Sequence, residues 1–133
     1  MTTSISVATP IRLRALQVAA ALQLLNVGFQ YVTAGELFPR GGPERLHAGG
    51  ALLLHVVGLA ALVAAVLHWR QDGGPRGLAV LAAVVLVAGI VQAATGGRET
   101  LWIHVPGAMV LTLGAGWLVG WAVTTRTGRN ATA

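Results

Sequence analysis

Two histidines that stand in matching contexts are the residues of this sequence best suited to chemistry. The segments His47-x-x-Gly50-Ala51-x-x-Leu54 and His104-x-x-Gly107-Ala108-x-x-Leu111 each open an apolar run long enough to cross a bilayer. Ionisable side chains inside a membrane are costly and usually functional. Two imidazoles that face each other in a helix bundle can hold a haem iron. We therefore expect His47 and His104 to be metal ligands, with hydrogen bonding between helices as the competing interpretation.

The other two histidines stand in different contexts. His55 lies two helical turns after His47 and about 80° away around the same helix, so it could reach the bundle interior. It could replace His47 as the ligand or bind a second group, and the alternative is an interior histidine bonded to another helix. His68 stands beside Trp69 and Arg70 at a helix end, so we expect an interfacial side chain.

The composition indicates an integral membrane protein. Hydrophobic residues make up 55% of the 133 residues, charged residues make up 10%, and the mean hydropathy is +0.71. The net charge of +5 comes from arginines that stand singly at segment ends, so we expect no nucleic-acid binding. Since the chain has no cysteine, disulfides, iron–sulfur clusters and covalent haem attachment are excluded. Any haem would be held non-covalently.

Four apolar segments predict four membrane-spanning helices, which cover residues 11–34, 44–69, 77–95 and 100–125. We expect a disordered N-terminal tail over residues 1–10 and a polar tail over residues 126–133. Prolines and glycines in the connections predict reversals of chain direction. The expected fold class is all-α, an integral membrane four-helix bundle with antiparallel, up-down topology.

Arginine positions predict how the bundle is oriented. One side carries six arginines: Arg12, Arg14, Arg70, Arg76, Arg126 and Arg129. The other side carries three: Arg40, Arg45 and Arg98. Because arginines collect in short cytoplasmic loops, we expect both termini in the cytoplasm and the protein in a prokaryotic plasma membrane.

In this arrangement the second and fourth helices run in the same direction, so His47 and His104 lie at equal depth near the outer face. In a bundle with short loops these helices occupy diagonal corners and leave a slot between them for a flat cofactor. Gly49, Gly50 and Gly107 would let a macrocycle approach the backbone closely.

The repeat continues into the two preceding helices, which end with Gln30 and Thr33 in one case and Gln92 and Thr95 in the other. We therefore expect two fused helix hairpins related by a pseudo-two-fold axis. The glutamines are expected to form hydrogen bonds between helices.

With these segments the sequence resembles the heme A synthases, whose longer chains contain two four-helix halves, each with a histidine pair. Thr33-Ala34-Gly35-Glu36-Leu37-Phe38-Pro39 is similar to the Thr-Gly-rich segment after that family's first span. Glu44-Arg45-Leu46-His47 resembles its Glu-x-x-His motif, and Ile103-His104-Val105 resembles the opening of its fourth helix. The likeness covers one half of the family's chain. This sequence departs from the family at Ala48, where an arginine is usual, and in lacking outer-loop cysteines.

The resemblance implies oxidation of a haem methyl group, with Glu44 as a catalytic group and His47 and His104 on or near the iron. A simpler interpretation of Glu44 is a carboxylate favoured by the dipole at a helix start. Arg45 and Arg98 would anchor haem propionates through charge-assisted hydrogen bonds, or else extend to the lipid headgroups.

The leading hypothesis is therefore a small integral membrane haem protein with bis-histidine ligation near the outer face, either an oxidoreductase like the heme A synthases or a non-catalytic relative. A cofactor-free accessory or scaffold subunit is one alternative, and a quinone-reactive electron carrier with a b-type haem is another. The expected partners are the lipid bilayer and haem, with a second copy or a larger membrane complex. The residues do not distinguish a b-, o- or a-type haem.

Overall fold

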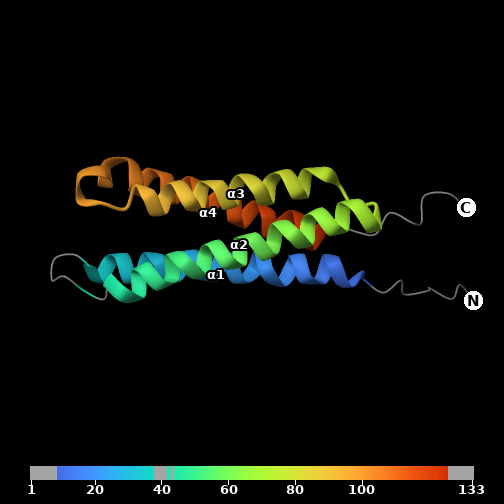
Figure 1. The fold of residues 1–133 in the computed structure, drawn as a ribbon, viewed down its shortest axis with the longest axis horizontal. Helices are drawn as coiled ribbons and strands as arrows, with labels where there is room; N and C mark the ends of the chain where they lie inside the picture. Colours follow the sequence, from blue (N-terminus) through green and yellow to red (C-terminus); the bar gives the residue numbers. More distant parts are fainter. Residues whose placement is uncertain (1–8, 38–41, 43, 126–133) are drawn as a thin grey trace, which may run out of the picture.

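The computed structural model describes residues 9–37, 42 and 44–125. These residues form four long helices: α1 (Ile11–Leu37), α2 (Glu44–Asp72), α3 (Arg76–Ala94) and α4 (Leu101–Thr124). A short 3₁₀ helix, η1 (Arg98–Thr100), leads into α4. The described part of the chain contains no strand, so its fold class is all-α, and Figure 1 shows an elongated bundle.

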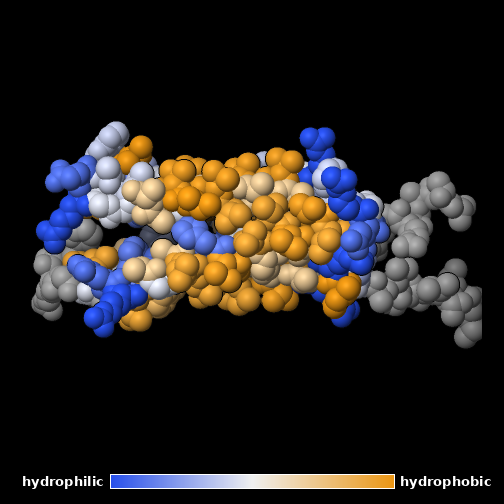
Figure 2. All heavy atoms as spheres, viewed as in Figure 1, coloured by the Kyte–Doolittle hydropathy of each residue, from blue (hydrophilic) through white to orange (hydrophobic). Residues whose placement is uncertain are grey.

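All four helices are long and apolar enough to span a membrane. Their outward side chains are apolar as well, with Leu25 71% exposed, Leu52 66% and Leu113 75%. Figure 2 shows an apolar band between two polar ends. A surface of this kind suits lipid rather than water, so the chain is an integral membrane protein.

Each helix packs against two neighbours. α1 and α3 both pack against α2 and α4, and among the described residues the backbones of α2 and α4 do not approach each other closely. Neighbouring helices run antiparallel, because Gln30 near the end of α1 bonds His47 at the start of α2, and Gln92 near the end of α3 bonds His104 near the start of α4. The helices that carry His47 and His104 therefore lie at diagonal corners.

The end of the bundle near Ile11, Asp72, Arg76 and Thr124 is called here the termini end (Figure 1). It has a closed apolar core. Small alanines let the helices approach closely and leucines fill the remaining space. The core residues that are at most 1% exposed at this end and toward the centre include Leu13, Leu16, Ala61, Ala65, Leu78, Leu118 and Ala122.

The opposite end, near Leu37, Glu44, Ala94 and Leu101, is called here the histidine end, and it is packed more loosely. In the described residues Gly89 is the last buried residue of α3 and Leu111 is the first buried residue of α4. Figure 2 shows the molecule hollowed at this end, between the α1–α2 pair and the α3–α4 pair.

The helix ends differ from the expected ones in three places. α1 continues through Gly35 to Leu37, since one glycine in a long helix costs only about 1 kcal/mol. α2 continues to Asp72, whose carboxylate bonds side chains on α1 and α2. The connection before α4 contains η1, in which the Thr100 hydroxyl donates to two backbone carbonyls of the same connection. The predicted tails lie outside the described residues, apart from residues 9 and 10.

Candidate functional site

His47 lies in the first turn of α2 and its ring contacts α1. Its Nδ1 is 2.9 Å from Oγ1 of Thr33. That hydroxyl donates its hydrogen to the carbonyl oxygens of Phe29 and Gln30, which lie 3.2 and 3.1 Å away. A hydroxyl that has donated its single hydrogen can only accept a hydrogen bond from the imidazole. In the tautomer that matches this arrangement, His47 carries its proton on Nδ1 and keeps the Nε2 lone pair available.

His104 lies in the first turn of α4 and its ring contacts α3. Its Nδ1 is 3.0 Å from the carbonyl oxygen of Gln92. Since a carbonyl can only accept, Nδ1 donates and Nε2 again keeps its lone pair. Metal-ligating histidines usually have this arrangement, in which the other ring nitrogen donates to an oxygen that fixes the tautomer and the ring orientation.

The structure brings His47 and His104 to the same end of the bundle. Each is the fourth residue of its helix, and each is half-buried. Two rings with available Nε2 atoms thus stand on diagonal helices at the hollowed end.

Two of the glycines next to these histidines serve a different purpose from the expected one. A Cβ atom at Gly50 would overlap the side-chain amide of Gln30, and one at Gly107 would overlap the amide of Gln92. We expected Gly50 and Gly107 to make room for a macrocycle. In the structure they make room for glutamines of the preceding helix, whereas the space beside Gly49 is open.

His55 lies on the side of α2 that faces α3, near Gly89. Its Nε2 is buried without a hydrogen-bond partner in the described residues, and so is Oε1 of Gln92. Thr112, which corresponds to His55 in the sequence repeat, instead accepts a hydrogen bond from Tyr31 across the α1–α4 interface, 3.0 Å away. The two hairpins therefore differ at this depth.

The other predicted site residues lie at the rim of the histidine end. Glu44, Arg45 and Arg98 are exposed, and none pairs with an opposite charge among the described residues. Glu44 stands three residues before His47, which puts both side chains on neighbouring positions of one helix face. Arg40 lies outside the described residues.

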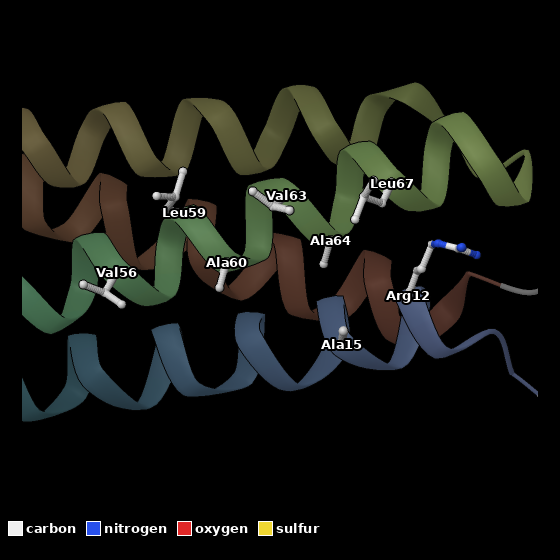
Figure 3. Close-up of a pocket in the computed structure, with 8 residues that line it drawn as sticks. All are labelled: Arg12, Ala15, Val56, Leu59, Ala60, Val63, Ala64 and Leu67. Carbon is white, nitrogen blue, oxygen red and sulfur yellow. The ribbon is translucent and has the colours of Figure 1, made fainter.

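A groove of about 450 Å³ lies elsewhere, between α1 and α2, with Arg12 at its end (Figure 3). It is lined mostly by aliphatic side chains of α2, and neither His47 nor His104 belongs to it.

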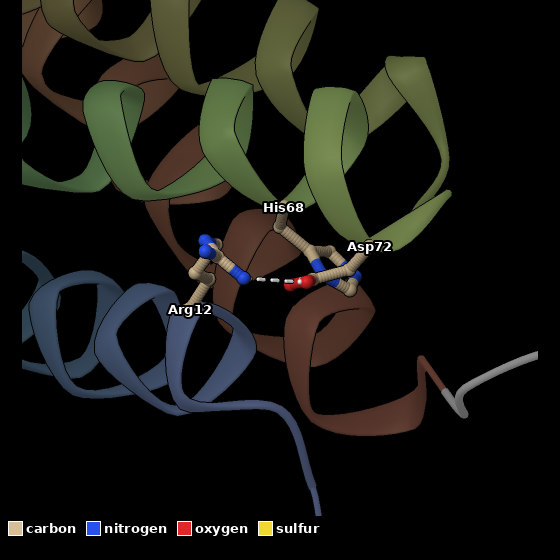
Figure 4. Close-up of polar contacts among 3 residues, drawn as sticks. All are labelled: Arg12, His68 and Asp72. Atoms are coloured by element: carbon tan, nitrogen blue, oxygen red, sulfur yellow. Dashed lines mark hydrogen bonds and ion pairs between the residues drawn. The ribbon is translucent and has the colours of Figure 1, made fainter.

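Sequence reasoning missed a polar cluster at the termini end. His68, expected at the interface, is 2% exposed, and its Nδ1 lies 3.0 Å from Oδ2 of Asp72. The other oxygen of Asp72 accepts from Nη1 of Arg12 at 2.8 Å (Figure 4). The ring occupies the space that a Cβ at Gly74 would need. The available signal was the His68-x-x-x-Asp72 spacing, which puts both side chains on one helix face.

Among the described residues no group of three or more His, Cys, Asp or Glu side chains could hold a metal ion by itself. A haem needs only axial ligands from the protein, because the macrocycle supplies the other four nitrogens. Comparison of the chain with models of known protein families, with curated proteins and with solved structures finds no match. The resemblance to the heme A synthases therefore stays a prediction.

Proposed function

We propose that this protein is a small integral membrane haem protein whose axial ligands are His47 and His104. The observation that carries the proposal is the matched bonding of the two rings, in which each Nδ1 donates to an oxygen of the preceding helix. Iron ligation requires the lone pair that this bonding leaves on Nε2. The hydrogen bond at Nδ1 fixes the orientation of each ring.

The surroundings of the two histidine rings suit a haem. The hollow between the hairpins lies at the same end as the histidines (Figure 2). Arg45 and Arg98 are exposed at this end as well and would pair with propionates. When bound, a haem supplies one-electron redox chemistry. The protein's own contribution is to orient the ligands, through Thr33 and through the carbonyl of Gln92, and to shield them partly from water.

We propose further that α1–α2 and α3–α4 are two copies of one hairpin unit. Support comes from a repeated contact, in which the glutamine near the end of the first helix lies against the glycine three residues after the histidine, Gln30 against Gly50 and Gln92 against Gly107. The copies have diverged at the ring partner, which is a hydroxyl for His47 and a carbonyl for His104.

The arginine distribution supports an orientation with both termini in the cytoplasm of a prokaryotic cell and the histidine end outside. Because the chain has no cysteine, single cysteines can be introduced at Gln71 and at Glu99, which are exposed at opposite ends. A membrane-impermeant maleimide added to intact cells is expected to label Glu99→Cys and not Gln71→Cys. The reverse pattern would overturn the orientation.

The absorbance spectrum of the detergent-purified full chain, titrated with haem, tests the ligation. We expect a Soret band with sharp α and β bands on reduction, typical of six-coordinate bis-histidine iron. His47→Ala and His104→Ala should each lose this spectrum. His68→Ala, which removes a histidine at the opposite end, is the matched control and should keep it.

Two outcomes would contradict the ligand assignment. A wild-type chain that takes up no haem would exclude haem binding, and a spectrum that survives His47→Ala but not His55→Ala would move the ligand to His55. Enzyme activity of the heme A synthase type is a separate proposal that depends on the resemblance. It predicts a mass change from haem O to haem A that is lost in Glu44→Ala.

A cofactor-free scaffold is the second candidate, and one observation favours it. Both rings already have a hydrogen-bond partner on a neighbouring helix, which is what interhelical bonding alone would require. In that case the purified chain shows no chromophore, and His104→Ala lowers only the stability of the bundle. A quinone-reactive electron carrier would share the haem spectrum and differ in its reaction with quinol.

A further inference from the structure

The groove between α1 and α2 is open to the outside of the bundle. It is separate from the candidate haem site. Its floor consists of small side chains, Ala15 on α1 and Ala60 and Ala64 on α2, and larger α2 side chains such as Val56 and Leu67 line it (Figure 3). In a membrane protein, an apolar groove that is open along its side is filled from the lipid phase.

The length of the groove matches one leaflet of a bilayer. Its α2 lining runs from Val56 to Leu67, and eleven helical steps of 1.5 Å cover about 16 Å. Half of a hydrocarbon core of about 30 Å is about 15 Å. The groove thus extends from the termini end to the middle of the bundle and stops there.

Arg12 gives the groove a charged end. It is the one charged residue in the lining, and it lies at the end of the groove nearest Leu67 (Figure 3). Its Nη1 bonds Asp72, but its side chain is still 38% exposed. A guanidinium has five N–H donors, so donors remain for an anion after that bond is made.

The wider environment of Arg12 is also positive. Arg14, Arg70 and Arg76 lie at the same end, and Asp72 is the acidic residue among the described residues there. Phosphate oxygens bind guanidinium groups through strong charge-assisted hydrogen bonds, and anionic headgroups attract basic residues near a membrane surface.

We propose that this groove binds an anionic phospholipid from the leaflet at the termini end, with one acyl chain along Ala15, Ala60 and Ala64 and the phosphate on Arg12. A helix of a second copy would follow α1 and α2 over their full length, whereas the groove covers one leaflet. An isoprenoid quinone has an apolar tail but no anion for Arg12. This inference does not depend on haem binding.

Native mass spectrometry of the detergent-solubilised full chain tests the proposal. The protein is mixed with equal amounts of phosphatidylglycerol and phosphatidylcholine that carry the same acyl chains. We expect the wild type to retain phosphatidylglycerol about fivefold more than phosphatidylcholine, the preference that one arginine near an anionic lipid provides. Arg12→Gln should bring the ratio close to one, and Arg14→Gln, which removes an exposed charge at the same end, should keep it.

A second pair of variants tests the acyl-chain part of the site. Ala60→Phe fills the groove and should reduce retention of both lipids several-fold, whereas Ala93→Phe, at an exposed alanine on α3, should not. Arg12→Lys keeps the charge and should keep a preference for phosphatidylglycerol, which separates loss of the site from loss of the fold.

The proposal is overturned by equal retention of both lipids in the wild type, or by an equal loss of preference in Arg12→Gln and Arg14→Gln, since diffuse attraction to the basic end would then suffice. Unchanged lipid retention in Ala60→Phe would show that the acyl chain does not lie in the groove. A dimer that forms with loss of lipid would assign the groove to a second copy of the chain.

Discussion

The two ends of this bundle are built in opposite ways. At the termini end leucines and alanines close the core, and Asp72 bonds both the buried His68 and the partly exposed Arg12. Toward the histidine end, polar side chains of α1 also bond backbone carbonyls of α2, as Asn26 does with Gly50 at 2.8 Å and Gln30 with His47 at 3.1 Å. The termini end is closely packed, whereas the histidine end has a hollow and two histidines, His47 and His104, with available Nε2 atoms.

The comparison teaches that position, rather than residue type, decides what a histidine does here. His68 is 2% exposed and packed against the turn at Gly74, so it has no room for a ligand. His47 and His104 are half-buried at the end of the bundle that is hollowed (Figure 2). A site built on rigid elements needs a well-packed region to support it, and the termini end provides that support.

Removing a core leucine should produce the largest effect on stability. Leu118 is 0% exposed in the core of the termini end, and Leu118→Ala should lower the free energy of unfolding by about 3 kcal/mol through lost contacts and a cavity. Leu113, 75% exposed on the same helix, is the control, and Leu113→Ala should cost less than about 0.5 kcal/mol. Unfolding in mixed detergent micelles measures both. Equal effects would mean that the termini end is no better packed than the lipid-facing surface.

A pair of glycine substitutions should distinguish the closely packed termini end from the more loosely packed histidine end. In Gly74→Ala the new Cβ would overlap the buried His68 ring, which has no space to move, so we expect a loss of about 2 kcal/mol. In Gly107→Ala the new Cβ meets only the terminal amide of Gln92, a flexible group that can rotate away. That variant should stay within about 0.5 kcal/mol of the wild type in the same unfolding assay. A larger loss of unfolding free energy in Gly107→Ala than in Gly74→Ala would mean that the histidine end is the more closely packed of the two.

Much of this architecture could be predicted from the sequence because it depends on long apolar segments. An all-α class and four helices long and apolar enough to span a membrane follow from length and hydropathy, and α1 to α4 confirm both. The helix ends were less predictable, since they depend on contacts between distant residues. α2 extends to Asp72, for example, where Asp72 bonds Arg12 at the start of α1, 60 residues earlier in the chain.

The sequence predicted that the two candidate histidines lie at the same end of the bundle, but it did not predict their contacts. The repeat placed His47 and His104 in equivalent positions, but nothing local in the sequence shows that Gln30 and Gln92 fill the space beside Gly50 and Gly107. Nor does the sequence show which atom fixes each ring. Such contacts depend on side-chain rotamers and on the register between helices, which apolar segments specify poorly.

The hydroxyl that orients His47 should affect ligand binding more than stability. Thr33→Val keeps the shape of the side chain and removes the bond to Nδ1, so haem affinity should fall roughly tenfold, as is common when a group that orients a metal ligand is lost. Thr124→Val is the control, because the Thr124 hydroxyl bonds only carbonyls of its own helix at the termini end. Haem titration followed by absorbance measures both. An unchanged affinity in Thr33→Val would show that Thr33 does not position a ligand.

The smallest expected effect concerns the hydrogen bond that joins α1 to α4 toward the histidine end. The Thr112 hydroxyl donates to the carbonyl of Ala108 at 2.7 Å, so Tyr31 is the donor in its 3.0 Å bond with Thr112. Tyr31→Phe should cost about 0.6 kcal/mol, the average for an interhelical hydrogen bond in a membrane protein. Combined with Thr112→Val it should cost less than the sum of the two single variants, because both remove the same bond.

This double-mutant cycle measures how strongly the two hairpins are coupled next to the hollow. A coupling free energy near zero would mean that contacts at the termini end and the centre, including the bond from Gln17 to the carbonyl of Ala122, hold the hairpins together. The histidine end could then open at little cost. A coupling well above 1 kcal/mol would instead mean that the hollow is braced across α1 and α4, and that its width is fixed before any ligand binds.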